Sequence, residues 1–241
     1  MTLDYPRLLP NGDAAVSVEF GDSIDTKVNA SVLAFDRAVQ QAGMPGVIET
    51  VPTYRALMVH LDPLTADHSK LFDALLQLAR GTLPLSDNKR RWTVPVVYGG
   101  AHGKDLKALA QRHGMTSKEF VDIHLLTIYR VYMVGFMPGF TYLGGLDARL
   151  HTPRRPKPRL QIPGGSISIG GAQTAIGAAP SPSGWHLIGR TPIRCFVAER
   201  EPAFLFEAGD EVVFQAEDAD RWDTLKAASA AGELIANCEV F

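Results

Sequence analysis

Hydrophobic residues near the start of the chain alternate between strand-like and helix-like spacing. Ala14–Phe20 is a short apolar run that follows an Asn-Gly-Asp turn, and this pattern predicts a strand. Valines and Phe35 then recur at helical spacing after a cap at Asp25 or Ser23, which predicts an amphipathic helix. The glycine- and proline-containing stretch 43–46 predicts the end of that helix.

Two further apolar runs and a second helical pattern follow. Val47–Val51 and Arg55–Leu61 are separated by a Pro-Thr-Tyr turn, and both runs predict strands. Leucines at helical spacing over Leu71–Leu78 predict a helix, and Trp92–Val97 predicts one more strand. This order of strands and helices is that of a split β-α-β unit, so we expect a ferredoxin-like layer of helices on a sheet.

The second part of the chain begins with helical patterns. The polar stretch Ser86–Arg91 is the best candidate for a domain boundary, so we expect one domain over residues 1–88 and another over residues 89–241. Asp105–Arg112 and Ser117–Leu126 then predict two short amphipathic helices as a lead-in to the second domain.

After these helices the pattern becomes one of short strands separated by glycine and proline turns. Such a pattern predicts a closed or nearly closed β-barrel. Asp218–Ala231 predicts a terminal helix, and we expect the whole chain to be an α+β protein. The strands predicted for the barrel are Tyr129–Val134, Gln161–Pro163, Ile167–Ile169, His186–Ile188, Arg194–Val197 and Glu211–Phe214.

The composition excludes several kinds of function. A formal net charge of -2 and an isoelectric point near 6.4 provide no basic field for nucleic acid. Cys195 and Cys238 lack the spacing of a metal site and the histidines are scattered, so we expect no metal site. No apolar run approaches the roughly 20 residues of a membrane span, and the N-terminus has no signal-peptide pattern, so we expect a cytoplasmic protein.

The run Gly99–Asp105 superficially resembles a phosphate-binding loop. A P-loop needs glycine, four residues, and then Gly-Lys followed by serine or threonine. Tyr98 and Asp105 occupy the first and last of these positions here, so no hydroxyl is available for a magnesium ion. We therefore do not expect a nucleotide site at this loop.

The stretch from Gly135 to Pro192 concentrates glycine, proline, aromatic and arginine residues. Its first block, Gly135–Leu146, has glycines that permit close backbone approach to a ligand. Phe140 and Tyr142 are the candidates for the wall on the apolar side of that ligand. The alternative is that these aromatic residues only seal the core of the barrel.

The next block, Thr152–Arg159, holds four basic residues interleaved with prolines. Because proline restricts the backbone, the guanidinium groups of Arg154 and Arg159 could be held out at low entropic cost, ready for a carboxylate or a phosphate. We take these two arginines as the candidates for anion binding. The alternative is a solvated charged face.

Further polar residues lie on glycine-rich turns at the ends of predicted strands, where they can orient a small polar substrate. His124 is the histidine that we consider for proton transfer, because it shortly precedes the dense stretch. Trp185 is a candidate platform for a substrate, with core packing as the alternative. The substrate-binding candidates of this group are Ser166, Gln173, Thr174, Trp185 and Arg190.

These blocks, taken in order, resemble a carboxyltransferase-type family whose members are known as the B subunit of 5-oxoprolinase, sporulation kinase inhibitor or allophanate hydrolase subunit 1. The resemblance rests on the Gly-Phe-x-Pro-Gly-Phe-x-Tyr-Leu block at Gly135–Leu143, the Pro-Arg pairs that end at Arg154 and Arg159, and Ile-Gly-Arg-Thr-Pro at Ile188–Pro192. It covers nearly the whole chain from the Gly-Asp turn at Gly12 onward.

The resemblance implies a ferredoxin-like N-terminal domain, a cyclophilin-like β-barrel, and ATP-dependent opening of 5-oxoproline to glutamate in a complex with a homologous C subunit. It also implies ATP with Mg²⁺ as the cofactor, held by the complex rather than necessarily by this chain. Under this interpretation Arg154 and Arg159 bind an anion, while Ser166, Gln173 and Thr174 bind a small cyclic amide by hydrogen bonds. The chain alone is expected to be inactive.

Two other functions stay open on this resemblance. Members of the family are also described as inhibitors of a sporulation histidine kinase, in which case the arginines and aromatic residues would contact a protein. Similar modules occur inside urea carboxylase, which suggests a carboxyltransferase-like role in urea or allophanate metabolism, as in an allophanate hydrolase or urea carboxylase subunit. The family pattern Gly-x-Gln-Thr-Gly-Ile-Tyr-Pro has its tyrosine replaced by Gly177, and Ser-Pro-Gly-Gly-Trp has its first glycine replaced by Ser183. The exact substrate is therefore not fixed.

Overall fold

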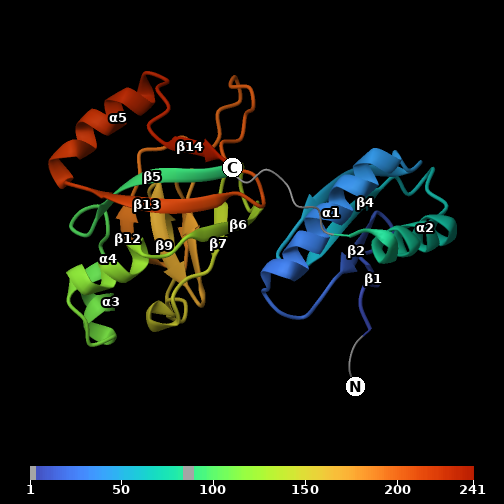
Figure 1. Ribbon diagram of the computed structural model, residues 1–241, viewed down its shortest axis with the longest axis horizontal. Helices are drawn as coiled ribbons and strands as arrows, with labels where there is room; N and C mark the ends of the chain where they lie inside the picture. Colours follow the sequence, from blue (N-terminus) through green and yellow to red (C-terminus); the bar gives the residue numbers. More distant parts are fainter. Residues whose placement is uncertain (1–3, 84–89) are drawn as a thin grey trace. The chain divides into compact units, whose positions relative to one another are not determined.

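The computed structural model describes residues 4–83 and 90–241. The chain divides into two compact units, Met1–Asp87 and Asn88–Phe241, each with its own hydrophobic core (Figure 1). Most of the polar stretch Ser86–Arg91, which we predicted as the boundary, lies outside the described residues. In the described ranges no helix has the length and the apolar character needed to cross a membrane.

The N-terminal unit is an antiparallel four-stranded sheet in the order β1-β2-β4-β3. Two helices share a core with this sheet, which joins Val32 and Phe35 of the first helix and Leu75 of the second to Val18 and Leu57 of the strands. The elements are β1 (Arg7–Pro10), β2 (Ala15–Glu19), α1 (Thr26–Ala42), β3 (Val47–Pro52), β4 (Ala56–Leu61) and α2 (His68–Gly81).

Helix α1 begins and ends where the sequence predicts. The Asp25 carboxylate accepts hydrogen bonds from the backbone N–H groups of Lys27 at 2.8 Å and Val28 at 3.2 Å, which satisfies donors that the first turn leaves free. Gly43 follows the helix with a φ of 55°, a left-handed conformation that glycine adopts without strain. Local signals of this kind explain why the predicted helix is confirmed.

The assignment of Trp92–Val97 to the N-terminal sheet is wrong. These residues belong to β5 (Arg90–Tyr98), which lies in the sheet of the second unit and pairs in parallel with β13 (Glu211–Glu217). The place beside β2 is taken by β1, which no sequence pattern predicted. A run of alternating buried residues identifies a strand, but it does not say which distant strand will be its partner.

The second unit is a closed barrel of seven strands. They follow one another in the order β12-β9-β10-β7-β6-β13-β5, and β5 pairs again with β12 to close the ring. The predicted barrel is therefore confirmed. The strands not yet given are β6 (Tyr129–Val134), β7 (Thr141–Gly144), β9 (Ser166–Gly170), β10 (Gln173–Ile176), β12 (His186–Arg190) and β14 (Asn237–Val240), the last of which pairs with the first half of β5.

Helices cover part of this barrel, as Figure 1 shows for the green α3 and α4 and the red α5. Helix α3 (Leu106–Arg112) packs against β12, and α4 (Ser117–Leu125) packs against β13. Thr116 and Glu119 form a capping box that starts α4, because each side chain accepts a hydrogen bond from the other residue's backbone. Helix α5 (Trp222–Ala230) follows the short 3₁₀ turn Ala219–Arg221. The three predicted helices of this unit are confirmed.

Two strands predicted for the barrel are not part of it. Gln161–Pro163 overlaps β8 (Arg159–Ile162), which pairs with β11 (Ser181–Ser183) in a separate two-stranded sheet. Arg194–Val197 forms no strand, and its one ladder contact is an isolated bridge between Phe196 and Phe204. In that segment the Arg200 guanidinium instead holds the chain by donating to backbone carbonyls, including those of Arg194 and Ala203.

Candidate functional site

Aromatic side chains gather on the outer face of the barrel over β7 and β10. Tyr142 on β7 lies opposite Ala175 on β10, and both share a cluster with Phe140 and Trp185 that is separate from the barrel core. The ring centroids of Phe140 and Tyr142 are 4.7 Å apart, and those of Tyr142 and Trp185 are 6.0 Å apart in an edge-on arrangement. We call the surface formed by Phe140, Tyr142 and Trp185, together with the Ala175 against which they pack, the aromatic face.

Arg154 lies over this aromatic face. Its guanidinium carbon is 5.6 Å from the centroid of the Trp185 ring, a cation–π arrangement. Burial raises the pKa of the Tyr142 hydroxyl, and the nearby Arg154 charge opposes that rise. Within the described residues no carboxylate pairs with the exposed Arg154, so its charge is available to a ligand.

Gln173 belongs to the same face of the sheet. It stands two residues before Ala175 on β10, and strand side chains two apart point the same way. Its partner across the ladder is Gly170, and a side chain there would come within 2.5 Å of the Trp185 ring. The missing side chain at Gly170 therefore lets Trp185 lie against the sheet beside Gln173. Among the described residues nothing hydrogen-bonds the amide of Gln173.

Phe136 extends the aromatic face toward solvent. Its ring meets Phe140 edge-on at 5.6 Å, and 64% of the residue is exposed. Its φ of 70° is unusual for a residue with a large side chain, and it is the single non-glycine residue with positive φ in the described part of the chain. The turn from Gly135 to Gly139 holds an aromatic ring outward at the cost of backbone strain.

Arg159 has a different environment from Arg154, although both end a Pro-Arg pair. Its two terminal nitrogens donate to the Asp105 carboxylate at 2.9 and 2.6 Å, and Arg155 donates to the same carboxylate at 3.3 Å. Burial alone would raise the pKa of Asp105, but the hydrogen bonds from Arg159 and from the Leu187 backbone N–H outweigh it and lower the pKa. The Arg159 fork is thus already occupied by a carboxylate of the chain itself.

This arrangement also explains the Gly99–Asp105 run. Asp105 ends the loop and ties it to β12 and β8, while Gly103 packs so closely that a side chain there would collide with the Ile188 carbonyl oxygen. Asp105 was not among the residues that the sequence predicted as partners of the arginines. Its place directly before a helix gave no signal of a contact with residues about fifty positions later.

His124 lies inside the unit rather than at the aromatic face. It is fully buried, and this burial lowers its pKa to about 3. Thr174 Oγ1 donates to the Ser168 carbonyl at 3.0 Å and so accepts from His124 Nε2 at 3.3 Å, which leaves Nδ1 to accept from the Tyr98 hydroxyl at 3.0 Å. Tyr98, His124 and Thr174 therefore form a chain of hydrogen bonds in the core, in which His124 is neutral.

Ser166 and Arg190 also lie away from the aromatic face. Ser166 is fully buried and donates to the Pro163 carbonyl at 2.6 Å. Arg190 donates to the Gly164 carbonyl and stacks on Trp222 at the mouth of a small cavity. Of the ten candidate residues, the structure brings together five, which are Phe140, Tyr142, Arg154, Gln173 and Trp185.

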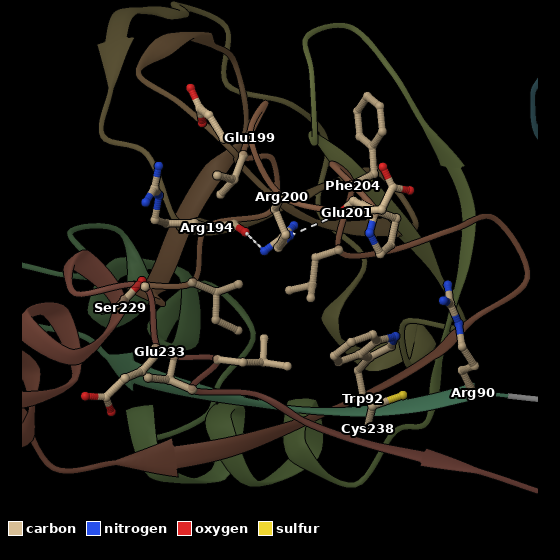
Figure 2. Close-up of a pocket in the computed structure, with 17 residues that line it drawn as sticks. Arg90, Trp92, Arg194, Glu199, Arg200, Glu201, Phe204, Ser229, Glu233 and Cys238 are labelled. Atoms are coloured by element: carbon tan, nitrogen blue, oxygen red, sulfur yellow. Dashed lines mark hydrogen bonds between the residues drawn. The ribbon is translucent and has the colours of Figure 1, made fainter.

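A cavity of about 510 Å³ contains none of the candidate residues (Figure 2). Its walls are mostly apolar and include Trp92 and Phe204, with Glu199, Glu201 and Glu233 at its margin. Arg200 donates hydrogen bonds to backbone carbonyls, including those of Arg194 and Cys195. In Figure 2 the Arg194 side chain points away from the cavity. The cavity thus combines apolar walls with charged groups of both signs at its edge.

The chain is similar in sequence to known proteins over most of its length. The family model "Carboxyltransferase domain, subdomain C and D" matches residues 6–206. The B subunit of 5-oxoprolinase from Bacillus subtilis is 37% identical over 225 residues, which cover 89% of this chain and 93% of the relative. The B subunit of 5-oxoprolinase from Escherichia coli O157:H7 is 41% identical over 174 residues, covering 71% of this chain and 78% of the relative.

Two solved structures are similar. The crystal structure of TTHA0988 is 32% identical, with a TM-score of 0.75 over 85% of this chain, and this chain spans 40% of that one. The K. lactis urea amidolyase has a TM-score of 0.82 over 97% of this chain and 16% of its own, and at 16% identity it shows the fold alone. The family match and the identities to the curated relatives show that the chain belongs to the carboxyltransferase-domain family of subdomains C and D, among the B subunits of 5-oxoprolinase.

Proposed function

We propose that this chain is the B subunit of an ATP-dependent complex that opens 5-oxoproline to glutamate. The observation that carries the proposal is its identity of 37% and 41% to two proteins named as B subunits of 5-oxoprolinase, over most of the chain. The chemistry of the aromatic face supports the same conclusion, because it suits a small ring that bears a carboxylate.

The substrate would lie beside Arg154, against the exposed part of the aromatic face. A flat side of a five-membered lactam can pack against the partly exposed Tyr142, while its carboxylate can accept a bidentate hydrogen bond from the Arg154 guanidinium, which Trp185 supports. The Gln173 amide can donate to the lactam carbonyl and accept from the lactam N–H. These contacts bind and orient the ring.

Ring opening adds one water across the lactam C–N bond, so this bond breaks, the carbonyl carbon gains a hydroxyl group and the ring nitrogen gains a proton. The coupled hydrolysis of ATP to ADP and phosphate consumes a second water. Among the described residues no base for the ring-opening water stands on the aromatic face, and His124 is buried within the core with its pKa lowered to about 3. We therefore assign substrate positioning to this chain and the remaining catalytic groups to other subunits. A homologous C subunit is the partner that the proposal requires, and the chain alone is inactive.

The described residues of this chain do not fit ATP. The Gly99–Asp105 run lacks the hydroxyl of a P-loop, and its aspartate is committed to Arg159. The 510 Å³ cavity is mostly apolar, and its three glutamates stand beside three arginines, of which Arg90 pairs with Asp210 and Arg200 with backbone carbonyls, so it offers no excess of positive charge to a triphosphate. Over residues 4–83 and 90–241 no three or more acidic, histidine or cysteine side chains gather as a metal site. We infer that ATP and its metal ion belong to the rest of the complex.

We also propose the finer fold classes. In the N-terminal unit, β2, α1, β3, β4 and α2 follow the order of a split β-α-β unit, with β1 in place of its last strand, which supports a ferredoxin-like class. In the second unit, the closed barrel with helices packed against β12 and β13 supports a cyclophilin-like class.

The first test uses the complex reconstituted by co-expression with the C subunit and the other subunits. ATP hydrolysis should rise on addition of 5-oxoproline, and Arg154→Lys should raise the half-saturating 5-oxoproline concentration about 10- to 100-fold, because it removes the planar fork that binds a carboxylate. Lys157→Gln is the matched control, since Lys157 is exposed on the same loop. The measurement is the rate of ATP hydrolysis as a function of 5-oxoproline concentration for the wild type and both variants.

Two outcomes would count against this proposal. If the lactam fails to stimulate ATP hydrolysis while urea or allophanate does, the chain works in urea metabolism, an alternative consistent with the glycine at position 177. If none of these compounds stimulates hydrolysis, the exposed Phe136 ring favours the kinase-inhibitor alternative, in which the aromatic face binds a protein surface.

A further inference from the structure

A second cavity, of about 240 Å³, lies where the end of β12 meets helix α5. Three basic side chains line it, and none of its lining residues is acidic. They are Arg190 at the end of β12, Arg194 four residues later, and Lys226 on α5. A concave surface with cations of one sign attracts anions.

Arg190 is fixed in place before any ligand arrives. Its Nε and Nη2 donate to the Gly164 carbonyl at 3.2 and 3.0 Å, and its guanidinium carbon lies 4.7 Å from the centroid of the Trp222 ring. No described residue accepts a hydrogen bond from Nη1, so the outer edge of the fork is available. A guanidinium held by stacking and by a carbonyl loses little entropy when it binds an anion.

The charge of Arg190 also has no carboxylate partner within the described chain. Three other partly buried arginines each chelate a carboxylate, since Arg90 binds Asp210, Arg91 binds Glu211 and Arg159 binds Asp105. Burial lowers the pKa of Arg190, and among the described residues no carboxylate offsets that burial. The cavity is therefore an incompletely neutralised basic site.

The other donors surround the same space. Thr191 is buried at the cavity, and its hydroxyl oxygen accepts from the Ile193 N–H at 3.3 Å, which leaves the hydroxyl proton to donate. Lys226 stands one helical turn after Trp222, so both face the same side of α5. Figure 2 shows that the Arg194 guanidinium points away from the 510 Å³ cavity, which leaves it free to serve this one.

We propose that this cavity binds the phosphoryl group of a small phosphorylated molecule. Three cations and a hydroxyl donor suit a dianion with several oxygen acceptors better than a monoanionic carboxylate. The volume of about 240 Å³ lies below the roughly 300–1,000 Å³ of pockets that enclose drug-sized ligands, so the site suits a phosphoryl group and is too small to enclose a whole nucleotide. The assignment goes beyond the proposed function and does not depend on lactam hydrolysis.

The test measures binding of inorganic phosphate, acetyl phosphate, ATP and acetate to the full chain. Trp222 lies directly against Arg190, so its fluorescence reports on the cavity, and calorimetry measures the affinity. We expect saturable binding of phosphate and acetyl phosphate with a dissociation constant of about 1 mM or below, and at least about tenfold weaker binding of acetate. If acetyl phosphate binds more tightly than phosphate, the ligand of the cavity is a phosphorylated molecule, as proposed. If phosphate binds as tightly or more tightly, the ligand is free phosphate and the proposal of a phosphorylated molecule is wrong.

Variants separate a binding role from a structural one. Lys226→Gln and Arg190→Lys should each weaken phosphate binding at least about fivefold. Lys226 is exposed, so its replacement does not threaten the fold even if Arg190 variants prove unstable. Arg221→Gln is the control, because Arg221 adjoins Trp222 but does not line the cavity. The proposal is overturned if phosphate shows no saturation below about 10 mM, if acetate or ATP binds as tightly as phosphate, or if Lys226→Gln has no effect.

Discussion

At the scale of single residues, partners decide what a side chain can do. Arg154 and Arg159 follow proline in the same loop, yet Arg159 chelates Asp105 whereas Arg154 lies on Trp185 with its fork directed to no carboxylate of the described chain. Breaking the partly buried pair of Arg159 and Asp105 would leave two charges without a partner in a poorly solvated place. We therefore assign Arg159 a structural role, in which it holds Asp105 and the loop that ends there. Arg154 is the arginine that a ligand can use.

His124 leads to a prediction about pH. Its pKa falls from an ordinary value near 6.5 to about 3 in the folded protein, so the unfolded chain binds the extra proton between these values. Stability should therefore fall as pH drops below about 6.5, with His124 contributing up to about 1.4 kcal/mol per pH unit. Urea unfolding of the wild type and of His124→Gln between pH 7 and pH 4 measures the difference in slope.

The His124→Gln variant should be less stable at pH 7, because the chain from Tyr98 through His124 to Thr174 is weakened. Its stability should then change less with acid than that of the wild type. Identical slopes for the two proteins would mean that His124 becomes protonated within the folded state, and this would reopen its assignment to proton transfer.

At the scale of elements, the packing of Trp185 on β9 positions the aromatic face. A side chain at Gly170 would come within 2.5 Å of the Trp185 ring. Gly170→Ala should therefore cost about 1–3 kcal/mol in the free energy of unfolding and shift Trp185 away from Arg154. Denaturant unfolding gives the first quantity, and near-ultraviolet circular dichroism reports the second.

Gly177 offers a matched control one strand away. A side chain there would approach no atom closer than 3.6 Å, which is ordinary contact, and its φ is not in the left-handed region. Gly177→Ala should leave stability within about 1 kcal/mol of the wild type. If both variants lose the same free energy of unfolding, the contact with Trp185 is not the reason why position 170 needs glycine.

At the scale of the whole molecule, the proposed function requires assembly. Several large apolar side chains of the second unit are exposed, including Phe136 at 64%, Leu126 at 80% and Leu160 at 95%. Such exposure is typical of protein contact surfaces when the side chains form a patch. With the C subunit, the chain should form a complex that buries roughly 1,600 Å² or more.

Size-exclusion chromatography with light scattering tests this assembly. The co-expressed chain and C subunit should elute together at micromolar concentration, and replacing Phe136 with serine should weaken the complex more than replacing Leu64 of the other unit, which is also exposed. Separate elution of the two wild-type proteins would contradict the prediction. That result would mean that the chain acts without the C subunit.

Much of the secondary structure was determined by the sequence alone, because its signals are local. The cap at Asp25, the glycine at position 43 and the capping box at Thr116 act within a few residues of themselves, and the helices they bound are confirmed. The short strands between glycine and proline turns likewise predicted a barrel. The family resemblance, carried by runs of neighbouring residues, is also confirmed.

Only the tertiary structure decided which distant elements meet. Strand β5 joined the barrel instead of the N-terminal sheet, and Arg159 found Asp105 across 54 residues of sequence. Thr174 and Gln173 are neighbours in sequence, yet one faces the core and the other the aromatic face, because strand side chains alternate. Pairing, register and burial depend on the closed barrel as a whole, so no local pattern could separate the residues of the aromatic face from those of the core.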